Sequence, residues 1–133
     1  MSHAGDLWTR AVKALQVAKF TVGVDFDTAA SKAYYAAFYA VSALFAVQGQ
    51  NFTKHTAVEG AVHRDLVKTG AWPPELGEKY SRLVESRILG DYGGSLHVQK
   101  ERALTAIEHA RDILRAVAKM KPELFLWQEE LSL

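Results

Sequence analysis

Apolar residues recur every three or four positions along most of the chain, which is the spacing that gathers them on one face of an α-helix. Five stretches show this spacing, with no strand-like alternation and no internal repeat. The predicted helices cover about residues 6–20, 25–47, 53–70, 73–90 and 96–120. Because the connections are short, neighbouring helices should be antiparallel. The pattern predicts an all-α protein, an up-and-down helical bundle of about five helices.

Residues that start or stop helices mark most of these boundaries. Either Asp25 or Asp27 can cap the second helix, because an aspartate side chain accepts hydrogen bonds from free N–H groups in the first turn. Pro73 and Pro74 fit the entry of the fourth helix, where a missing N–H costs little. Residues 91–95 predict a loop before the fifth helix. The glycines near predicted helix ends are Gly23, Gly49, Gly70 and Gly90.

The second predicted helix is the most apolar, so it should lie at the centre of the bundle. It carries two neighbouring stripes of aromatic and hydroxyl-bearing residues. The two stripes are Tyr34, Phe38, Val41 and Phe45, and Ser31, Tyr35, Tyr39 and Ser42. The first stripe is typical of a core. The hydroxyl groups of the second need hydrogen-bond partners, so it should line a groove or a subunit interface.

Length and composition narrow the class of protein. The chain has 133 residues, and we expect a single domain over residues 1–133, with its core at about 5–120 and a tail at 121–133. A net charge of +1 gives no general attraction to nucleic acid. The absence of cysteine excludes disulfides and thiolate metal sites. No stretch resembles a signal peptide or approaches the ~20 apolar residues of a membrane span, which predicts a soluble, cytoplasmic protein.

The tail is amphipathic enough over residues 122–131 for one further short helix. Ordered terminal helices commonly dock on their own domain, so we expect the tail to fold back on the bundle. Alternatively, its apolar side chains dock on a partner chain. These side chains are Leu124, Phe125 and Trp127.

No standard enzyme motif is present, because the chain lacks a glycine-rich phosphate loop, histidine pairs at metal-binding spacing and a nucleophile elbow. We therefore expect no cofactor and no metal. One polar pair is unusual, since Arg87 and Asp91 lie four residues apart and share a helix face. The pair is either a brace at a helix end or an arginine that the aspartate holds toward a phosphate, with Tyr92 beside it.

Two histidines are candidates for acid–base chemistry, because histidine titrates near neutral pH. His55 follows Lys54 in the first turn of the third predicted helix. His97 lies just inside the fifth, and the two glycines before it could turn it back toward Arg87. The simpler interpretations are a hydrogen-bonded structural His55 and a surface His97.

A basic stripe lies on the fifth predicted helix, where Arg111, Arg115 and Lys119 recur every four residues. Like charges at this spacing repel each other, although cations are favoured near a helix C-terminus. The stripe is either a solvated face or a phosphate-binding strip. His63 and His109 fall among charged residues and should face solvent.

Taken together, these residues resemble the HEPN domain family (higher eukaryotes and prokaryotes nucleotide-binding), especially its small stand-alone prokaryotic branch. The resemblance covers about residues 5–120. The matching residues are Ser31 to Ala36 with Phe38 and Tyr39, then Lys54 and His55, then Arg87 with Asp91 and Tyr92, and the alanine-rich segment from Ala103 to Ala118.

The resemblance implies a helical bundle that often forms a homodimer and works beside a minimal nucleotidyltransferase as a toxin–antitoxin pair. Members with ribonuclease activity carry an arginine followed, after four to six residues, by a histidine, and two copies face each other and cleave RNA without metal. In this chain residue 92 is tyrosine, and Lys32 stands where an arginine is more usual. The implied nucleotide- or RNA-binding residues are Arg87, Asp91, Tyr92, Tyr35, Lys54 and Lys32.

Two functional hypotheses follow. In the first, the protein is a noncatalytic homodimer whose groove holds a nucleotide or a nucleotidyltransferase partner. In the second, it is a metal-independent ribonuclease toxin in which Arg87 binds phosphate and His55 or His97 moves the proton. The missing arginine–histidine spacing favours the first. A third possibility is that the Tyr92 phenol is a modification acceptor for the partner enzyme.

Overall fold

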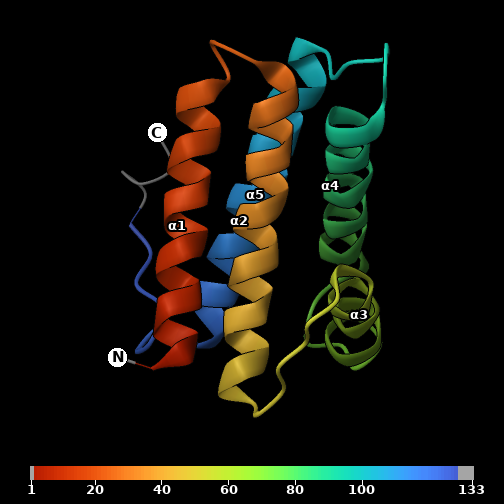
Figure 1. Cartoon of the computed structure of the whole chain (residues 1–133). Coiled ribbons are helices and arrows are strands. Elements are labelled where there is room, and N and C mark those ends of the chain that lie inside the picture. The colour runs from red at the N-terminus through yellow and green to blue at the C-terminus, as the bar shows by residue number, and fades with distance from the viewer. Residues whose placement is uncertain (1, 129–133) are drawn as a thin grey trace.

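Every regular element in the described part of the chain is a helix. The computed structural model describes residues 2–128. Its elements are α1 (His3–Thr21), α2 (Phe26–Val47), α3 (His55–Ala61), the π-helix η1 (Val62–Val67), α4 (Pro74–Tyr92) and α5 (Lys100–Met120). The long helices α1, α2, α4 and α5 run alternately up and down (Figure 1), which confirms the predicted all-α up-and-down bundle. Within this range, no helix has the length and apolar character needed to cross a bilayer.

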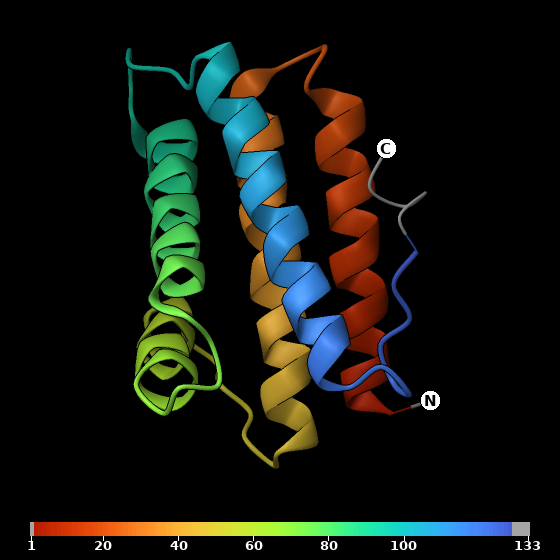
Figure 2. The same cartoon turned by 180° about the vertical axis from the view of Figure 1, so that it is seen from behind.

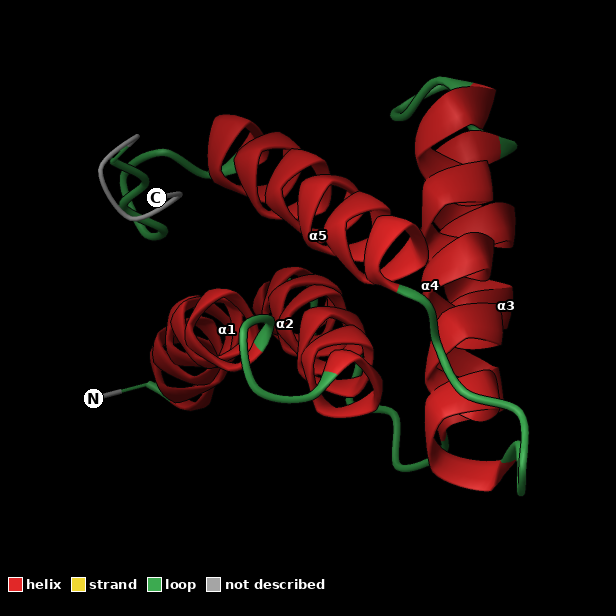
Figure 3. Cartoon of the chain, turned by 90° about the horizontal axis from the view of Figure 1, so that it is seen from above, coloured by secondary structure: helices red, strands yellow, loops and turns green. Residues whose placement is uncertain are grey.

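The centre of the bundle is α2, which contacts α1, α4 and α5. Figures 2 and 3 show α1 and α2 side by side, with α5 packed across one face of the pair and α4 standing with α3 at the other edge. Alanines make this central position possible, because a methyl group lets neighbouring helices approach closely. The fully buried alanines of α2 are Ala29, Ala30, Ala33, Ala36, Ala37, Ala40 and Ala43. Of the predicted core stripe, Tyr34, Val41 and Phe45 are buried and Phe38 is half-buried.

Two aspartates at the start of α2 have different roles. Asp25 caps the helix, because its side chain accepts a hydrogen bond from a backbone N–H of the first turn. Asp27 instead accepts the N–H of Val98 at 2.7 Å and lies 2.7 Å from His97 Nδ1. These contacts hold residues 97 and 98 outside the helix, so α5 begins at Lys100. The predicted start at residue 96 was wrong, and His97 precedes α5.

The end of α4 also differs from expectation, because the helix continues through Asp91 and Tyr92. The N–H of Gly93 still donates to a carbonyl of the preceding helical turn, at 3.0 Å. The chain turns only at Gly94, whose φ of 62° suits glycine. The predicted loop from residue 91 was therefore wrong at its first two positions. The third predicted helix is also divided, since α3 begins at His55 and gives way to η1.

Three side chains lie in environments other than those predicted. The apolar pattern predicts Ile88 and Leu104 as buried, but they are 48% and 40% exposed. The inward face of α4 buries the nearby Ser86, and that of α5 buries the neighbouring Ala103. His109 was expected to face solvent, but both its ring nitrogens are buried, because it lines the cleft between α4 and α5. Burial, first of all, lowers the pKa of this imidazole.

The tail folds back on α1 as far as residue 128, as predicted. Phe125 is 1% exposed, and its ring stacks on that of Trp8 with centroids 5.0 Å apart. The indole N–H of Trp8 donates to the carbonyl of Leu126 at 3.1 Å. The expected short helix is absent from the described part of the tail, because residues 121–125 form turns and bends. Residues 129–131 of that prediction lie outside the described range.

We predict that Phe125→Ala lowers the free energy of unfolding by about 3 kcal/mol, because it deletes a buried ring and leaves a cavity against Trp8. Leu126→Ala is the matched control, because its side chain is 71% exposed, and it should change stability by less than about 0.5 kcal/mol. Urea unfolding followed by circular dichroism measures both variants. Equal effects of the two substitutions would contradict docking of the tail through Phe125.

Candidate functional site

The Arg87 side chain extends from α4 toward α2 and is 16% exposed. Its Nη2 atom donates to the Tyr35 hydroxyl at 3.3 Å. Its Nε atom lies 3.1 Å from Asp91 Oδ2, an ion pair that lacks the alignment of a hydrogen bond. The predicted Arg87–Asp91 pair is therefore present. Because the guanidinium has five N–H donors, these two contacts leave several of them for a ligand.

Three tyrosine rings surround the guanidinium. Its central carbon lies 5.4 Å from the ring centroid of Tyr34, 5.7 Å from that of Tyr35 and 5.5 Å from that of Tyr92. Aromatic faces attract a cation at such distances without cancelling its charge. Tyr34 is buried, whereas Tyr92 is 70% exposed. The guanidinium therefore lies between the buried ring of Tyr34 on its inner side and the exposed ring of Tyr92 on its outer side.

His55, at the start of α3, packs against the same rings. Its Nδ1 atom lies 2.6 Å from the Tyr34 hydroxyl, and its ring stacks on Phe38 with centroids 4.4 Å apart. Burial, and then the charge of Arg87, lower the pKa of His55. Burial chiefly raises the pKa of Tyr34 to about 12. We therefore assign the hydroxyl as donor and Nδ1 as acceptor, which makes His55 neutral with its proton on Nε2.

We call Arg87, Asp91, Tyr92, Tyr34, Tyr35 and His55 the Arg87 cluster. Its assembly depends on how closely α4 approaches α2. At Gly90 a Cβ atom would lie 3.0 Å from the carbonyl oxygen of Asp27 at the start of α2. Because Arg87 lies about one helical turn before Gly90, this close approach brings the guanidinium within reach of the α2 tyrosines.

The structure brings some of the predicted site residues together and separates others. Arg87, Asp91, Tyr92, Tyr35 and His55 all belong to the cluster. Three others lie elsewhere. Lys54 is exposed just before α3, Lys32 lines a groove on the α1 side of α2, and His97 contacts Asp27.

Tyr34, a member of the Arg87 cluster, and Phe38, which packs against it, were not among the predicted site residues, because the apolar pattern placed both in the core stripe. Both hold His55, Tyr34 through its hydroxyl and Phe38 by ring stacking. The one available signal was the phenol of Tyr34, a polar group within an otherwise apolar stripe. Within residues 2–128, no group of three or more histidine, cysteine or acidic side chains is placed to hold a metal ion. The chemistry of the cluster is that of a fixed cation, an exposed aromatic ring and a neutral imidazole.

The fold and this site define a small helical-bundle protein with an arginine–tyrosine centre between α2 and α4. Residues 4–121 match the sequence model of the HEPN domain. A protein of Thermotoga maritima named "UPF0332 protein" is 40% identical over 97 residues, which are 73% of this chain and 74% of that protein. This chain therefore belongs to the HEPN domain family, as its residues predict.

Two further comparisons concern a more distant sequence relative and the fold. A protein of Methanocaldococcus jannaschii named "Putative toxin MJ0142" is 30% identical over 95 residues, which are 71% of this chain and 65% of that protein. The fold is similar to the crystal structure of TT1696 from Thermus thermophilus, with a TM-score of 0.76 over 90% of this chain and 98% of that one. Sequence identity to TT1696 is 24%, so this similarity concerns the fold alone.

The lowered pKa of His55 predicts that acid destabilises the protein. Below the usual histidine pKa of 6.5, the unfolded chain binds a proton that folded His55 resists, so stability falls as pH falls. The buried His109 acts in the same direction. We therefore expect His55→Gln to lose less stability than wild type between pH 7.5 and pH 5.5, as measured by urea unfolding at each pH. The same loss in both proteins would contradict the assigned neutral state.

Proposed function

We propose that this protein is a nucleotide- or RNA-binding module that acts as a noncatalytic homodimer with a minimal nucleotidyltransferase partner, in a toxin–antitoxin pair. The observation that carries the proposal is the Arg87 guanidinium, held in place while several of its donors stay unused. Arginine binds phosphate through paired N–H groups more specifically than lysine does.

Tyr92 adds a second contact for the same ligand. Its ring is 70% exposed and lies beside the guanidinium. Every nucleobase has a face that stacks on an aromatic ring, so a nucleotide with its phosphate on Arg87 would place its base on Tyr92. The partner enzyme and the toxin–antitoxin context rest on membership of the family, together with the toxin name of the Methanocaldococcus relative.

Exposed apolar side chains on the surface of α4 support the proposal of a homodimer. Ile88 is adjacent to Arg87 and 48% exposed, and Tyr92 lies one turn further along. Apolar side chains of this kind form the centres of protein–protein interfaces. A second copy on this strip would bring two Arg87 clusters toward each other.

A ribonuclease is the second candidate function, and one observation favours it. His55 and Arg87 contact the same Tyr34 ring, at 5.7 Å between ring centroids and 5.4 Å from the guanidinium carbon. A neutral imidazole could accept the proton of an RNA 2′-hydroxyl, while the guanidinium stabilises the charge on phosphorus oxygens. No metal would be required for that reaction.

We predict that Arg87→Ala weakens binding of a fluorescein-labelled single-stranded RNA in EDTA by about tenfold or more, since a charged hydrogen bond contributes about 1.5–3 kcal/mol. The matched control is Arg82→Ala, an exposed arginine of the same helix that lines the α4–α5 cleft. Fluorescence anisotropy measures the affinity, and gel electrophoresis of the same mixtures measures cleavage. Equal affinity of the two variants would overturn the binding site.

Cleavage in these mixtures decides between the two functions. The binding module leaves the RNA intact at high protein concentration. Cleavage by wild type that is lost in both Arg87→Ala and His55→Gln would instead establish the ribonuclease.

For the homodimer, we predict that Ile88→Asp shifts the protein to monomer, because a carboxylate in the centre of an apolar interface is desolvated without a partner. Val24→Asp is the control, since Val24 is 80% exposed in the connection between α1 and α2. Sedimentation velocity across a concentration series measures both. A monomeric wild-type protein, or a dimer that persists in Ile88→Asp, would contradict this interface.

A further inference from the structure

A groove of about 530 Å³ lies between α1 and α2. On the α1 side it is bordered by Arg10 and Lys13, and on the α2 side by Lys32, Tyr35 and Tyr39. On each helix these residues are three, four or seven positions apart, so they share one face. We call this surface the α1–α2 groove. Lys32 to Tyr39 extends about 10 Å along the axis of α2, enough for a short run of nucleotides.

All the charged groups that line the α1–α2 groove are cations. Arg10, Lys13 and Lys32 are exposed, and no ion pair joins any of them to a carboxylate within residues 2–128. Arg10 instead lies over the Tyr39 ring, 6.0 Å from its centroid. Three uncompensated positive charges at one groove attract an anion with regularly spaced charges.

The basic stripe of α5 provides a contrast. There Arg111 lies 2.8 Å from Glu108, and Arg115 lies 3.2 Å from Asp112. Neighbouring carboxylates cancel much of the charge of that stripe, which favours its interpretation as a solvated face. The positive charge of the α1–α2 groove is therefore a local property of that groove rather than a general feature of the bundle.

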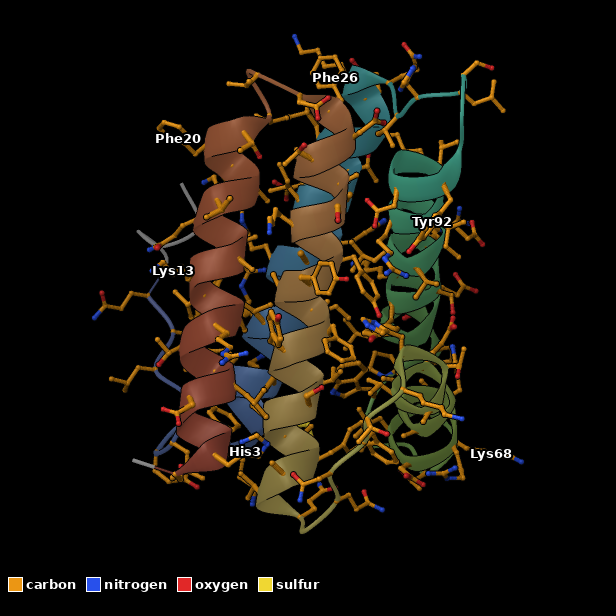
Figure 4. The ribbon with its side chains drawn as sticks, viewed as in Figure 1. His3, Lys13, Phe20, Phe26, Lys68 and Tyr92 are labelled. Carbon is orange, nitrogen blue, oxygen red and sulfur yellow. The ribbon has the colours of Figure 1, made fainter. Side chains whose placement is uncertain are left out.

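The groove is continuous with the Arg87 cluster through Tyr35. This residue borders the groove, and its hydroxyl accepts the hydrogen bond from Arg87 Nη2. Its ring is also 5.9 Å from that of Tyr39, centroid to centroid, so two neighbouring rings follow the groove wall. Figure 4 shows Lys13 on α1 and Tyr92 on α4, with α2 between these two helices.

We propose that the α1–α2 groove binds single-stranded RNA and leads the strand past Tyr35 to Arg87. Arg10, Lys13 and Lys32 contact successive phosphates, and the Tyr35 and Tyr39 rings stack on bases. Basic grooves with interleaved aromatic rings bind single strands in this way without reading their sequence. The proposal rests on the proposed function, because it assumes that the ligand of Arg87 belongs to a nucleic acid strand.

The aromatic wall favours RNA over an acidic protein segment. Carboxylates of a peptide would satisfy the three cations but would leave the two tyrosine rings without a flat partner. Nucleotides provide both the anion and the flat apolar face, at each step of the strand. Lys32 thereby gains a role that its separation from the Arg87 cluster otherwise leaves unexplained.

The test compares two triple variants in the full-length protein. The groove variant is Arg10→Gln, Lys13→Gln and Lys32→Gln. The control variant is Lys68→Gln, Lys100→Gln and Lys119→Gln, which removes the same charge from exposed positions elsewhere. Anisotropy with a labelled 12-nucleotide RNA across a salt series gives affinity and salt dependence, and calorimetry with adenosine 5′-monophosphate probes Arg87 alone.

We expect the groove variant to bind the 12-nucleotide RNA at least tenfold more weakly than wild type. Its slope of log affinity against log salt should fall by about 2, because each lost phosphate contact on a single strand removes about 0.7. The control triple should keep most of the affinity and the slope. Tyr39→Ala should weaken RNA binding as well, and Tyr39→Phe should restore it, since phenylalanine still stacks.

The outcomes separate this proposal from the proposed function. Loss of both ligands in Arg87→Ala, but of the long RNA alone in the groove variant, supports both. Equal RNA binding and equal salt slopes in the two triple variants overturn the groove and leave the Arg87 site standing. If wild type binds neither ligand, the proposed function fails and the groove proposal fails with it. A groove variant that loses only a nucleotidyltransferase partner would identify a protein-binding surface instead.

Discussion

The alanines of α2 determine where every other element can lie. A helix buried among three neighbours needs small side chains at each contact, and α2 supplies them along its whole length. Tyr34 and Phe38 lie in the sector of α2 that faces α3 and α4, where they meet His55. The site therefore lies where the alanine packing ends.

A nearly buried guanidinium needs compensation for the water that it loses. Arg87 receives it from one hydroxyl, one carboxylate and three ring faces. Only Asp91 among these carries a negative charge, and it is the more exposed member of the pair, at 31% of its side chain against 16%. The rings compensate for desolvation while leaving the positive charge in place. Such an arrangement differs from a structural ion pair, whose partners mainly neutralise each other.

Local sequence patterns were sufficient for the existence of the four long helices and for one contact within a helix. The Arg87–Asp91 pair follows from its spacing of four residues and is present, whereas the pattern offered Asp25 or Asp27 as the cap of the second helix, and the structure has Asp25. Local patterns could not predict contacts between segments that are distant in the sequence. Asp27 bonds to residues 70 and 71 positions away, and that contact delays the start of α5 and removes His97 from the helix. No periodicity within residues 96–120 contains that information.

The same limit applied to the site. The family resemblance grouped Arg87, Asp91, Tyr92 and Tyr35 as binding residues, and the ribonuclease hypothesis paired Arg87 with His55. Neither could show that Tyr34 connects His55 to Arg87. A residue on an apolar stripe is ordinarily assigned to the core, and Tyr34 is buried. Its second role depends on α3 packing against α2, a contact between two segments that the sequence pattern treats independently.

The contacts of His55 also bear on which function the cluster can perform. A catalytic base must accept a proton, and the Tyr34 hydroxyl already occupies Nδ1 as a donor. Protonation of Nδ1 would place its hydrogen against the hydroxyl hydrogen of Tyr34. Burial, and then the charge of Arg87, also lower the pKa of His55 and so disfavour the imidazolium. In the ribonuclease pattern the histidine would follow Arg87 after four to six residues, at position 92, 93 or 94, where α4 ends. Tyr92, at the first of these positions, presents an exposed aromatic ring instead. In the proposed function the cluster supplies a cation for an anionic ligand and lacks an unconstrained proton acceptor, which is the physical reason to favour binding over cleavage.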